Sequence, residues 1–502
     1  MNDLPRQKLR EIVARHGRSV IEDPRRCEGL LRDYCGEYRR EVSVLVMTLE
    51  ERAAADLLAA PAGTPREVLM ARLARRLCDN LALSERAATW AVDSWALALG
   101  VISNDELQAF EQRRSHQTET VTAPVPTKSR AQQTSTASGI SIIVSAKGDG
   151  EYTSLREALE NAAPGARLIV RPGIYNEGVI VDKRIEIIGD GPVEDIIISS
   201  VDSSCIQMRA DYAVVRDVTL RGRARGNTSF FAVDIPQGKL LLDQCDITSD
   251  TLSCVAVHGA TADPLIRRCR IHDGADSGVY FFDDAVGTLE ECEIFCNANV
   301  GVAITERANP IVRRSRIYDG NNAGVVVWKD GRGLIEACEV YGNRLAGIGI
   351  SEGGNLTVRT CRIYEGENSG VFVHHSGEGT LENCDIFKHR EAEVAITTRG
   401  NLSMRGCKIH HGQNSGVFVY EEGRVLLQDC AVNGNADTGV LIGTGALAAV
   451  RGCHIKGNGQ VAIKVSEGGA ASVEDSDLTD NLLGPWDVED GAFIEHARNR
   501  EQ

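Results

Sequence analysis

The sequence predicts a mainly β protein, a long parallel β-helix preceded by a small all-α helical bundle. Two observations predict the β-helix. A motif of the form x-Cys-x-Ile recurs at an interval of 24 residues once and of 23 residues thereafter. The charge two positions before each anchor also alternates in sign from one unit to the next. The anchors are Cys245, Cys269, Cys292, Ser315, Cys338, Cys361, Cys384, Cys407, Cys430, Cys453 and Ser476.

The repeat unit is too short to contain a crossover helix. Each anchor is followed after two residues by an aliphatic residue, such as Ile363, and in most units after nine residues by glycine, such as Gly370. A short alternating segment, here 371–373, comes next. Such a unit is one coil of a β-solenoid, whose coils stack about 4.8 Å apart. The cysteines are therefore expected to form an internal ladder rather than to act as nucleophiles.

The alternating charges support the same stacking. Arg267, Glu290, Arg313 and Glu336 occupy equivalent positions in consecutive units. Stacked like charges repel, whereas opposite charges in neighbouring strands attract by a few tenths of a kcal/mol each. We interpret these charges as structural.

Four segments are predicted along the chain. Residues 1–113 read as the helical bundle, a candidate interaction module, with Trp90 and Trp95 expected in its core rather than on a partner-binding face. Residues 114–139 are rich in Thr, Ser, Pro and Gln and read as a flexible linker. Residues 140–487 read as the β-helix, opened by a short cap helix within 150–160, and 488–502 as a polar tail.

The β-helix also shows a family resemblance. Residues 149–159 read DGEYTSLREAL and residues 172–191 read PGIYNEGVIVDKRIEIIGDG. This opening resembles that of pectinesterases and of other right-handed β-helix proteins. The later units resemble the repeats of pectin-lyase-like proteins, including the β-helix of F-box-type substrate adaptors. The resemblance covers roughly 140–485 and implies a right-handed parallel β-helix.

Composition excludes several classes of function. The formal net charge of -16 argues against a nucleic-acid partner. No apolar run is long enough for a membrane span, and the first residues lack the apolar core of a secretion signal. The chain has 15 cysteines but no zinc-ligand spacing, so we expect reduced thiols, a cytoplasmic location, no metal and no cofactor.

Candidate catalytic residues are few. The resemblance implies paired aspartates and an arginine for a pectinesterase, and these motifs are mostly missing. If the chain is an enzyme, the resemblance implies a polysaccharide hydrolase, lyase or esterase, and the candidates are Asp276, Asp283 and Asp284. Asp276 occupies a position where other units carry Asn299 and Asn322, which favours a corner ladder instead.

Candidate binding residues follow the glycine of alternate units. If they face outward, aromatic side chains recur roughly 10 Å apart on one sheet, a spacing suited to an extended glycan or peptide. The alternative is that large and small residues simply pack neighbouring coils, or that the bundle covers them. The candidates are Tyr280, Phe282, Trp328, Phe372, His374, Phe418 and Tyr420. We interpret a second aromatic ladder, three residues after the anchors, as structural; it comprises His272, Phe295, Tyr318, Tyr341, Tyr364, Phe387 and His410.

Three functions are consistent with these observations. The sequence favours a non-enzymatic adaptor, whose β-helix presents a rigid face to a protein or peptide while the bundle engages a second partner. The alternative is a carbohydrate-binding or carbohydrate-active protein with an extended glycan as partner. The second alternative is a structural solenoid that associates with itself, and the sequence does not specify an oligomeric state.

Overall fold

The computed structural model describes residues 4–20, 24–35, 38–50, 53–59, 66–81, 85–103, 106–107, 141–224, 226 and 228–501. The chain divides into two compact units, 1–134 and 135–502. The predicted linker, 114–139, lies outside the described residues. Among the described helices, none is both long and apolar enough to cross a membrane.

The first unit is helical, as predicted. Its core contains both predicted tryptophans: Trp95 is fully buried and Trp90 nearly so. The Trp95 indole Nε1 donates a hydrogen bond to the Leu45 carbonyl oxygen at 2.9 Å, which satisfies the one polar atom of that side chain. The helices are α1 (Leu4–His16), a 3-10 turn (Gly17–Val20), α2 (Pro24–Cys35), α3 (Arg39–Glu50), α4 (Ala53–Ala59), α5 (Arg66–Leu81) and α6 (Glu85–Ala98).

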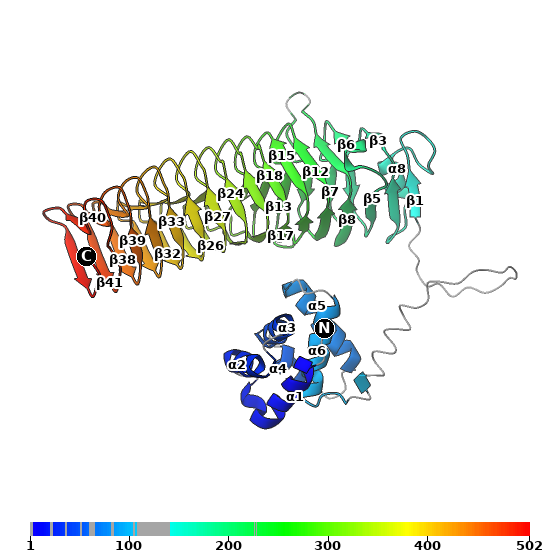
Figure 1. Ribbon diagram of the computed structural model, residues 1–502. Coiled ribbons are helices and arrows are strands. Elements are labelled where there is room, and N and C mark those ends of the chain that lie inside the picture. The colour runs from blue at the N-terminus through cyan, green and yellow to red at the C-terminus, as the bar shows by residue number, and fades with distance from the viewer. Residues whose placement is uncertain are drawn as a thin grey trace, which may run out of the picture. The chain divides into compact units, whose positions relative to one another are not determined.

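The second unit is a parallel β-helix whose coils wind through three sheets (Figure 1). Sheet A has 16 strands, from β1 (Ser141–Val144) to β43 (Phe493–Ala497), and sheet B has 13, from β3 (Gly173–Tyr175) to β39 (His454–Lys456). The strands of sheet C are β4 (Val179–Val181), β7 (Ile206–Met208), β10 (Val233–Ile235), β13 (Val255–His258), β16 (Val279–Phe282), β19 (Val302–Ile304), β22 (Val325–Val327), β25 (Ile348–Ile350), β28 (Val371–Val373), β31 (Val394–Ile396), β34 (Val417–Val419), β37 (Val440–Ile442), β40 (Ile463–Val465) and β42 (Trp486–Val488).

The cysteine ladder lies inside the coil, where sheet A turns sharply into sheet B. The residue before each anchor has a left-handed backbone, as at Glu291 (φ 55°). The Cys292 thiol then points inward and donates to the carbonyl oxygens of Glu290 and Ile266. Ser315 takes the same role by donating to its own corner carbonyl. The ladder is therefore structural, as predicted.

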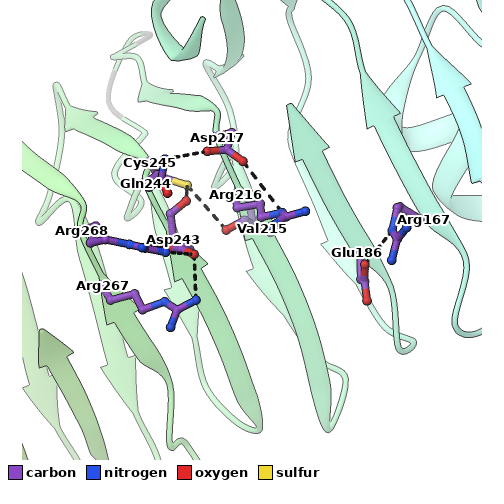
Figure 2. Close-up of polar contacts among 10 residues, drawn as sticks. All are labelled: Arg167, Glu186, Val215, Arg216, Asp217, Asp243, Gln244, Cys245, Arg267 and Arg268. Carbon is purple, nitrogen blue, oxygen red and sulfur yellow. Dashed lines mark hydrogen bonds and ion pairs between the residues drawn. The ribbon is translucent and has the colours of Figure 1, made fainter. Parts of the chain in front are cut away.

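The alternating charges form ion pairs between coils on sheet A. Figure 2 shows the first of them, where the nearly buried carboxylate of Asp243 accepts from Arg267 at 3.0 Å and from Arg268 at 2.6 Å. Further along the sheet, Arg313 pairs with Glu290 at 3.2 Å. In the strand register each of these carboxylates lies beside an arginine of an adjacent coil, which confirms the structural interpretation of the charges.

A cap and a last coil close the two ends of this unit. The predicted cap helix is α8 (Leu155–Asn161), whose Leu155, Ala158 and Leu159 join the core of the first coils. At the other end, residues 488–502 include β43, which pairs with β41 (Ala470–Glu474), where the sequence predicted only a polar tail. The pattern hid this coil because Asn499 replaces the Cys or Ser anchor; its amide donates to the Val473 carbonyl oxygen at 2.9 Å.

One coil departs from the repeat at two positions together. Five residues after the anchors, neighbouring coils alternate Gly and Asn, as Gly320, Asn343, Gly366 and then Gly412, Asn435. At that position stands His389, and four residues later Glu393 replaces the usual glycine. Both side chains are buried from solvent, and the His389 ring hydrogen-bonds the Glu393 carboxylate. The His389 Nε2 atom is buried without a partner.

Candidate functional site on sheet C

The predicted catalytic aspartates lie at opposite ends of β16. Asp276 precedes the strand and accepts hydrogen bonds from Ser253 at 3.0 Å and from Asn299 at 2.8 Å, and Asn322 in turn donates to Asn299. This is the polar corner ladder that the equivalent asparagines suggested. The structure therefore does not bring Asp276 together with Asp283 and Asp284.

Asp283 and Asp284 form the turn that leads from β16 into sheet A. Both have left-handed backbones, with φ of 54° and 60°. The Asp284 carboxylate makes a bidentate pair with Arg307 of the next coil, at 2.8 and 2.6 Å. The hydrogen bond from Arg307 lowers the pKa of Asp284, because it favours the charged form. The turn is held by an ion pair between coils.

The predicted binding aromatics all lie on the outward face of sheet C, and we call them the aromatic track. They pair along single strands: Tyr280 stacks on Phe282 at 4.6 Å between ring centroids, and the pairs Phe372–His374 and Phe418–Tyr420 follow at 4.6 and 4.4 Å. Because only every second coil carries an aromatic pair or Trp328, the strand positions of the track repeat every two coils, roughly 10 Å along the sheet.

Small residues of the intervening coils lie beneath the aromatic track. Ala303 and Thr305 are 1% and 0% exposed, and across them Tyr280 and Trp328 lie nearly parallel with ring centroids 6.3 Å apart. The rings therefore cover their small neighbours, and each track side chain remains only partly exposed. The alternation of large and small side chains from coil to coil therefore packs neighbouring coils, and it also leaves aromatic rings at the surface.

The ladder on sheet B is different because it is continuous. Neighbouring rings stack at 4.6–5.1 Å in every coil from His272 to His410. The guanidinium of Arg362 lies over the rings of Tyr364 and Phe387 at 5.0 and 5.4 Å, a cation–π contact. Ring faces in this ladder are occupied by other rings, as the structural interpretation predicted.

A groove of about 1010 Å³ lies over the first coils of sheet C. Its floor is formed by outward residues of β4, β7 and β10, with Ile180 47% exposed. Helix α8 forms one wall through Leu159, and the segment before β10 forms another through Phe230 and Phe231. Thr251 holds that segment, because its Oγ1 donates to the Phe230 carbonyl oxygen at 2.6 Å.

The groove contains a hydrogen-bonded polar chain. Arg209 donates to Gln207 at 3.0 Å, and Gln207 donates to Asp234 at 3.1 Å. The other oxygen of Asp234 lies 2.9 Å from His258 Nε2. This chain joins the groove lining, through Asp234, to His258 on the next strand of sheet C.

Ring contacts join this groove to the aromatic track. His258 stacks on Phe282 with ring centroids 4.7 Å apart, and Phe231 lies 6.5 Å from the same ring. Sheet C thus presents one continuous surface, from the polar groove on β4–β10 to the aromatic residues on β34. Within the described residues, no group of three or more His, Cys, Asp and Glu side chains is placed to share a metal ion.

Sequence reasoning missed the groove because the first coils are irregular. Equivalent positions of sheet C, Val179, Ile206, Val233, Val255 and Val279, follow one another at intervals of 27, 27, 22 and 24 residues. The first three of these positions also come before the first cysteine anchor, Cys245. Without a fixed period, the sequence could not place Gln207, Asp234 and His258 side by side.

A sequence profile described as a right-handed β-helix region matches residues 204–328, 253–402, 313–451 and 392–499. These overlapping matches cover more than half of the chain. The chain belongs to the right-handed β-helix family. Its predicted fold and its resemblance to β-helix repeat proteins are thereby confirmed.

Solved structures with a similar fold include three polysaccharide-acting enzymes. The A-module of the Azotobacter vinelandii mannuronan C-5 epimerase AlgE6 is 15% identical, over 68% of this chain and 93% of its own, with a TM-score of 0.34. The periplasmic alginate epimerase AlgG is 11% identical over 70% and 83%, with a TM-score of 0.38. The catalytic domain of a GH87 α-1,3-glucanase, in complex with tetrasaccharides, is 12% identical over 72% and 71%, with a TM-score of 0.43.

These comparisons correct the functional prediction made from sequence. The favoured interpretation was a non-enzymatic adaptor for a protein or peptide, whereas the similar structures are carbohydrate-active enzymes, the class of the alternative. The adaptor prediction finds no support among these structures and is not carried further. At these identities the likeness shows a shared fold only, so the chemistry of this chain has to be argued from its own surface.

Proposed function

We propose that this protein binds an extended carbohydrate chain along the outward face of sheet C. The observation that carries the proposal is the continuity of that face, where a polar groove passes through His258 and Phe282 into the aromatic track. Sugar rings offer C–H faces to aromatic side chains and hydroxyl groups to carboxylates and amides. The track supplies the first kind of partner and the groove supplies the second.

The groove also contains acceptors that the protein itself leaves free. Within the described part of the chain, the carboxylates of Asp182 and Asp202 in the groove lining make no ion pair or hydrogen bond. Ser203, Ser204 and Gln207 line the same space. Such acceptors and donors can form several hydrogen bonds with sugar hydroxyls, and charged acceptors form the stronger ones.

Affinity electrophoresis through gels that contain soluble polysaccharides tests this proposal. The wild-type chain should be retarded by at least one polymer. The variant Trp328→Ala/His374→Ala/Tyr420→Ala should lose most of that retardation, with its dissociation constant raised by roughly tenfold or more, because each stacking contact contributes about 1 kcal/mol.

The matched control removes three aromatic rings from the neighbouring sheet. In the variant Tyr318→Ala/Tyr341→Ala/Tyr364→Ala the sheet B ladder is interrupted while sheet C is unchanged. This control should migrate like the wild type in every gel. If the track variant and the wild type are retarded equally, sheet C is not the binding surface.

A further inference from the structure

The middle of sheet C is free of charged side chains. Nine consecutive strands, β13 to β37, each place two residues outward, and none of these is Asp, Glu, Lys or Arg. This is unusual in a chain with 25% charged residues. We call this surface the uncharged strip: Ala256, His258, Tyr280, Phe282, Ala303, Thr305, Val326, Trp328, Gly349, Ser351, Phe372, His374, Ala395, Thr397, Phe418, Tyr420, Leu441 and Gly443.

The other two sheets show that the lack of charge is specific to sheet C. On sheet B, consecutive coils carry Arg316, Glu339, Arg362 and Asp385 at one outward position. Sheet A carries the ladder that includes Arg313 and its partner of the previous coil. Alternating ion pairs between coils are therefore available to this fold, and the uncharged strip omits them.

The edge of the uncharged strip is acidic. The two-residue turns that lead from sheet C into sheet A hold more carboxylates than cations, and two of the cations face carboxylates of neighbouring coils: Arg307 pairs with Asp284, and Arg399 lies 3.9 Å from Glu422. The carboxylates are Asp283, Asp284, Glu306, Asp330, Glu352, Glu421 and Glu422, and the cations are Arg307, Lys329 and Arg399.

Two titratable groups within the strip, His374 and Tyr280, do not reverse this balance. Burial lowers the pKa of His374, with a smaller contribution from His375, so its imidazole is neutral at pH 7. Burial raises the pKa of Tyr280, so its phenol also stays neutral. An anionic chain on the strip would meet no cation on its central path and an excess of carboxylates at its edge.

We propose, on the basis of the glycan binding proposed above, that the uncharged strip of sheet C selects uncharged polysaccharides and excludes polyuronates and other anionic chains. Opposition of like charges lowers both the rate of encounter and the affinity, and the lack of a cation leaves an anionic group without a partner once it is desolvated. A neutral polysaccharide keeps both its rate of encounter and its affinity, since its hydroxyl groups can donate hydrogen bonds to neutral or acidic acceptors.

Titration calorimetry with the whole chain tests this selectivity. The probes are soluble neutral polymers (hydroxyethylcellulose, galactomannan, a mixed-linkage glucan) and anionic polymers (polygalacturonate, alginate), each at 20 and 200 mM salt. Neutral polymers should bind at least about tenfold more tightly than either anionic polymer. Their affinity should change less than twofold between the two salt concentrations, because no ion pair contributes.

A charge-addition variant provides the second measurement. Val326→Lys/Leu441→Lys places two cations on the strip and should raise the affinity for polygalacturonate by fivefold or more at 20 mM salt, an effect that 200 mM salt removes. The control Leu334→Lys/Leu426→Lys adds the same charge to outward positions of sheet A and should leave the affinity unchanged. If the wild type binds a polyuronate as tightly as the neutral polymers, or more tightly, the proposed selectivity is wrong but the proposed carbohydrate binding stands. If none of the polymers binds, the proposed function is wrong as well.

Discussion

Replacement of Ile363 by Asp should destabilise the β-helix by about 4 kcal/mol or more. Ile363 is fully buried in β27 (Arg362–Tyr364), in the aliphatic ladder between Val340 and Ile386. A carboxylate there has no partner, so it either remains charged in an apolar core or takes up a proton at a raised pKa. Chemical denaturation followed by circular dichroism measures the loss.

The control for this substitution is Ile311→Asp on the outward face of sheet A. Ile311 is 39% exposed, so the same change of side chain there should shift the free energy of unfolding by no more than about 0.5 kcal/mol. A comparable loss in both variants would mean that the coil register places Ile363 incorrectly.

The pair of His389 and Glu393 should produce the second large effect. Each single substitution, His389→Asn or Glu393→Gly, leaves one buried polar group without its partner and should cost about 3–5 kcal/mol. The double substitution places at these two positions the residue types that the other coils carry there, Asn and Gly. It should be as stable as the wild type or more stable by about 1–4 kcal/mol, because well-packed replacements of buried, paired polar groups often stabilise a protein.

The geometry of the other coils supports this expectation. Asn343 accepts a hydrogen bond from Gly320 N at 3.1 Å and donates to the Ile317 carbonyl oxygen, and Asn435 does the same in its coil. An asparagine at 389 would find the equivalent partners in Gly366 and Ile363. Denaturation of all four chains gives the coupling free energy. A double variant that is as unstable as the worse single variant would show that the pair is required for folding of this coil.

The regular coils were predictable because one interval fixes the register of every residue. With 23 residues per coil, Cys361 and Ile363 were predicted to face inward, and the structure buries both. The outward orientation of Phe372, which the sequence left open, is given by the structure. The alternating charges made the same prediction independently, since only stacked coils bring Arg313 next to Glu290.

The groove was not predictable because the period fails in the first coils, and the last coil was not predictable because Asn499 replaces its anchor. Asp234 and His258 lie on coils of irregular length, so no pattern in the sequence shows that their side chains meet at 2.9 Å. Phe231 reaches the groove from an irregular segment between β9 (Thr219–Gly222) and β10. The pairing of Glu393 with His389 was not predictable either. In the sequence, Glu393 shows only that this coil lacks the glycine of the repeat.

The most direct test of carbohydrate binding along sheet C is the fluorescence of Trp328. This residue lies in the middle of the aromatic track, whereas Trp90 and Trp95 are buried in the helical unit. In a chain with Trp486→Phe, titration with a polymer that retards the protein should shift and quench the Trp328 emission at the same concentrations that saturate binding. Binding with an unchanged Trp328 emission would place the carbohydrate elsewhere and contradict the proposed function of sheet C.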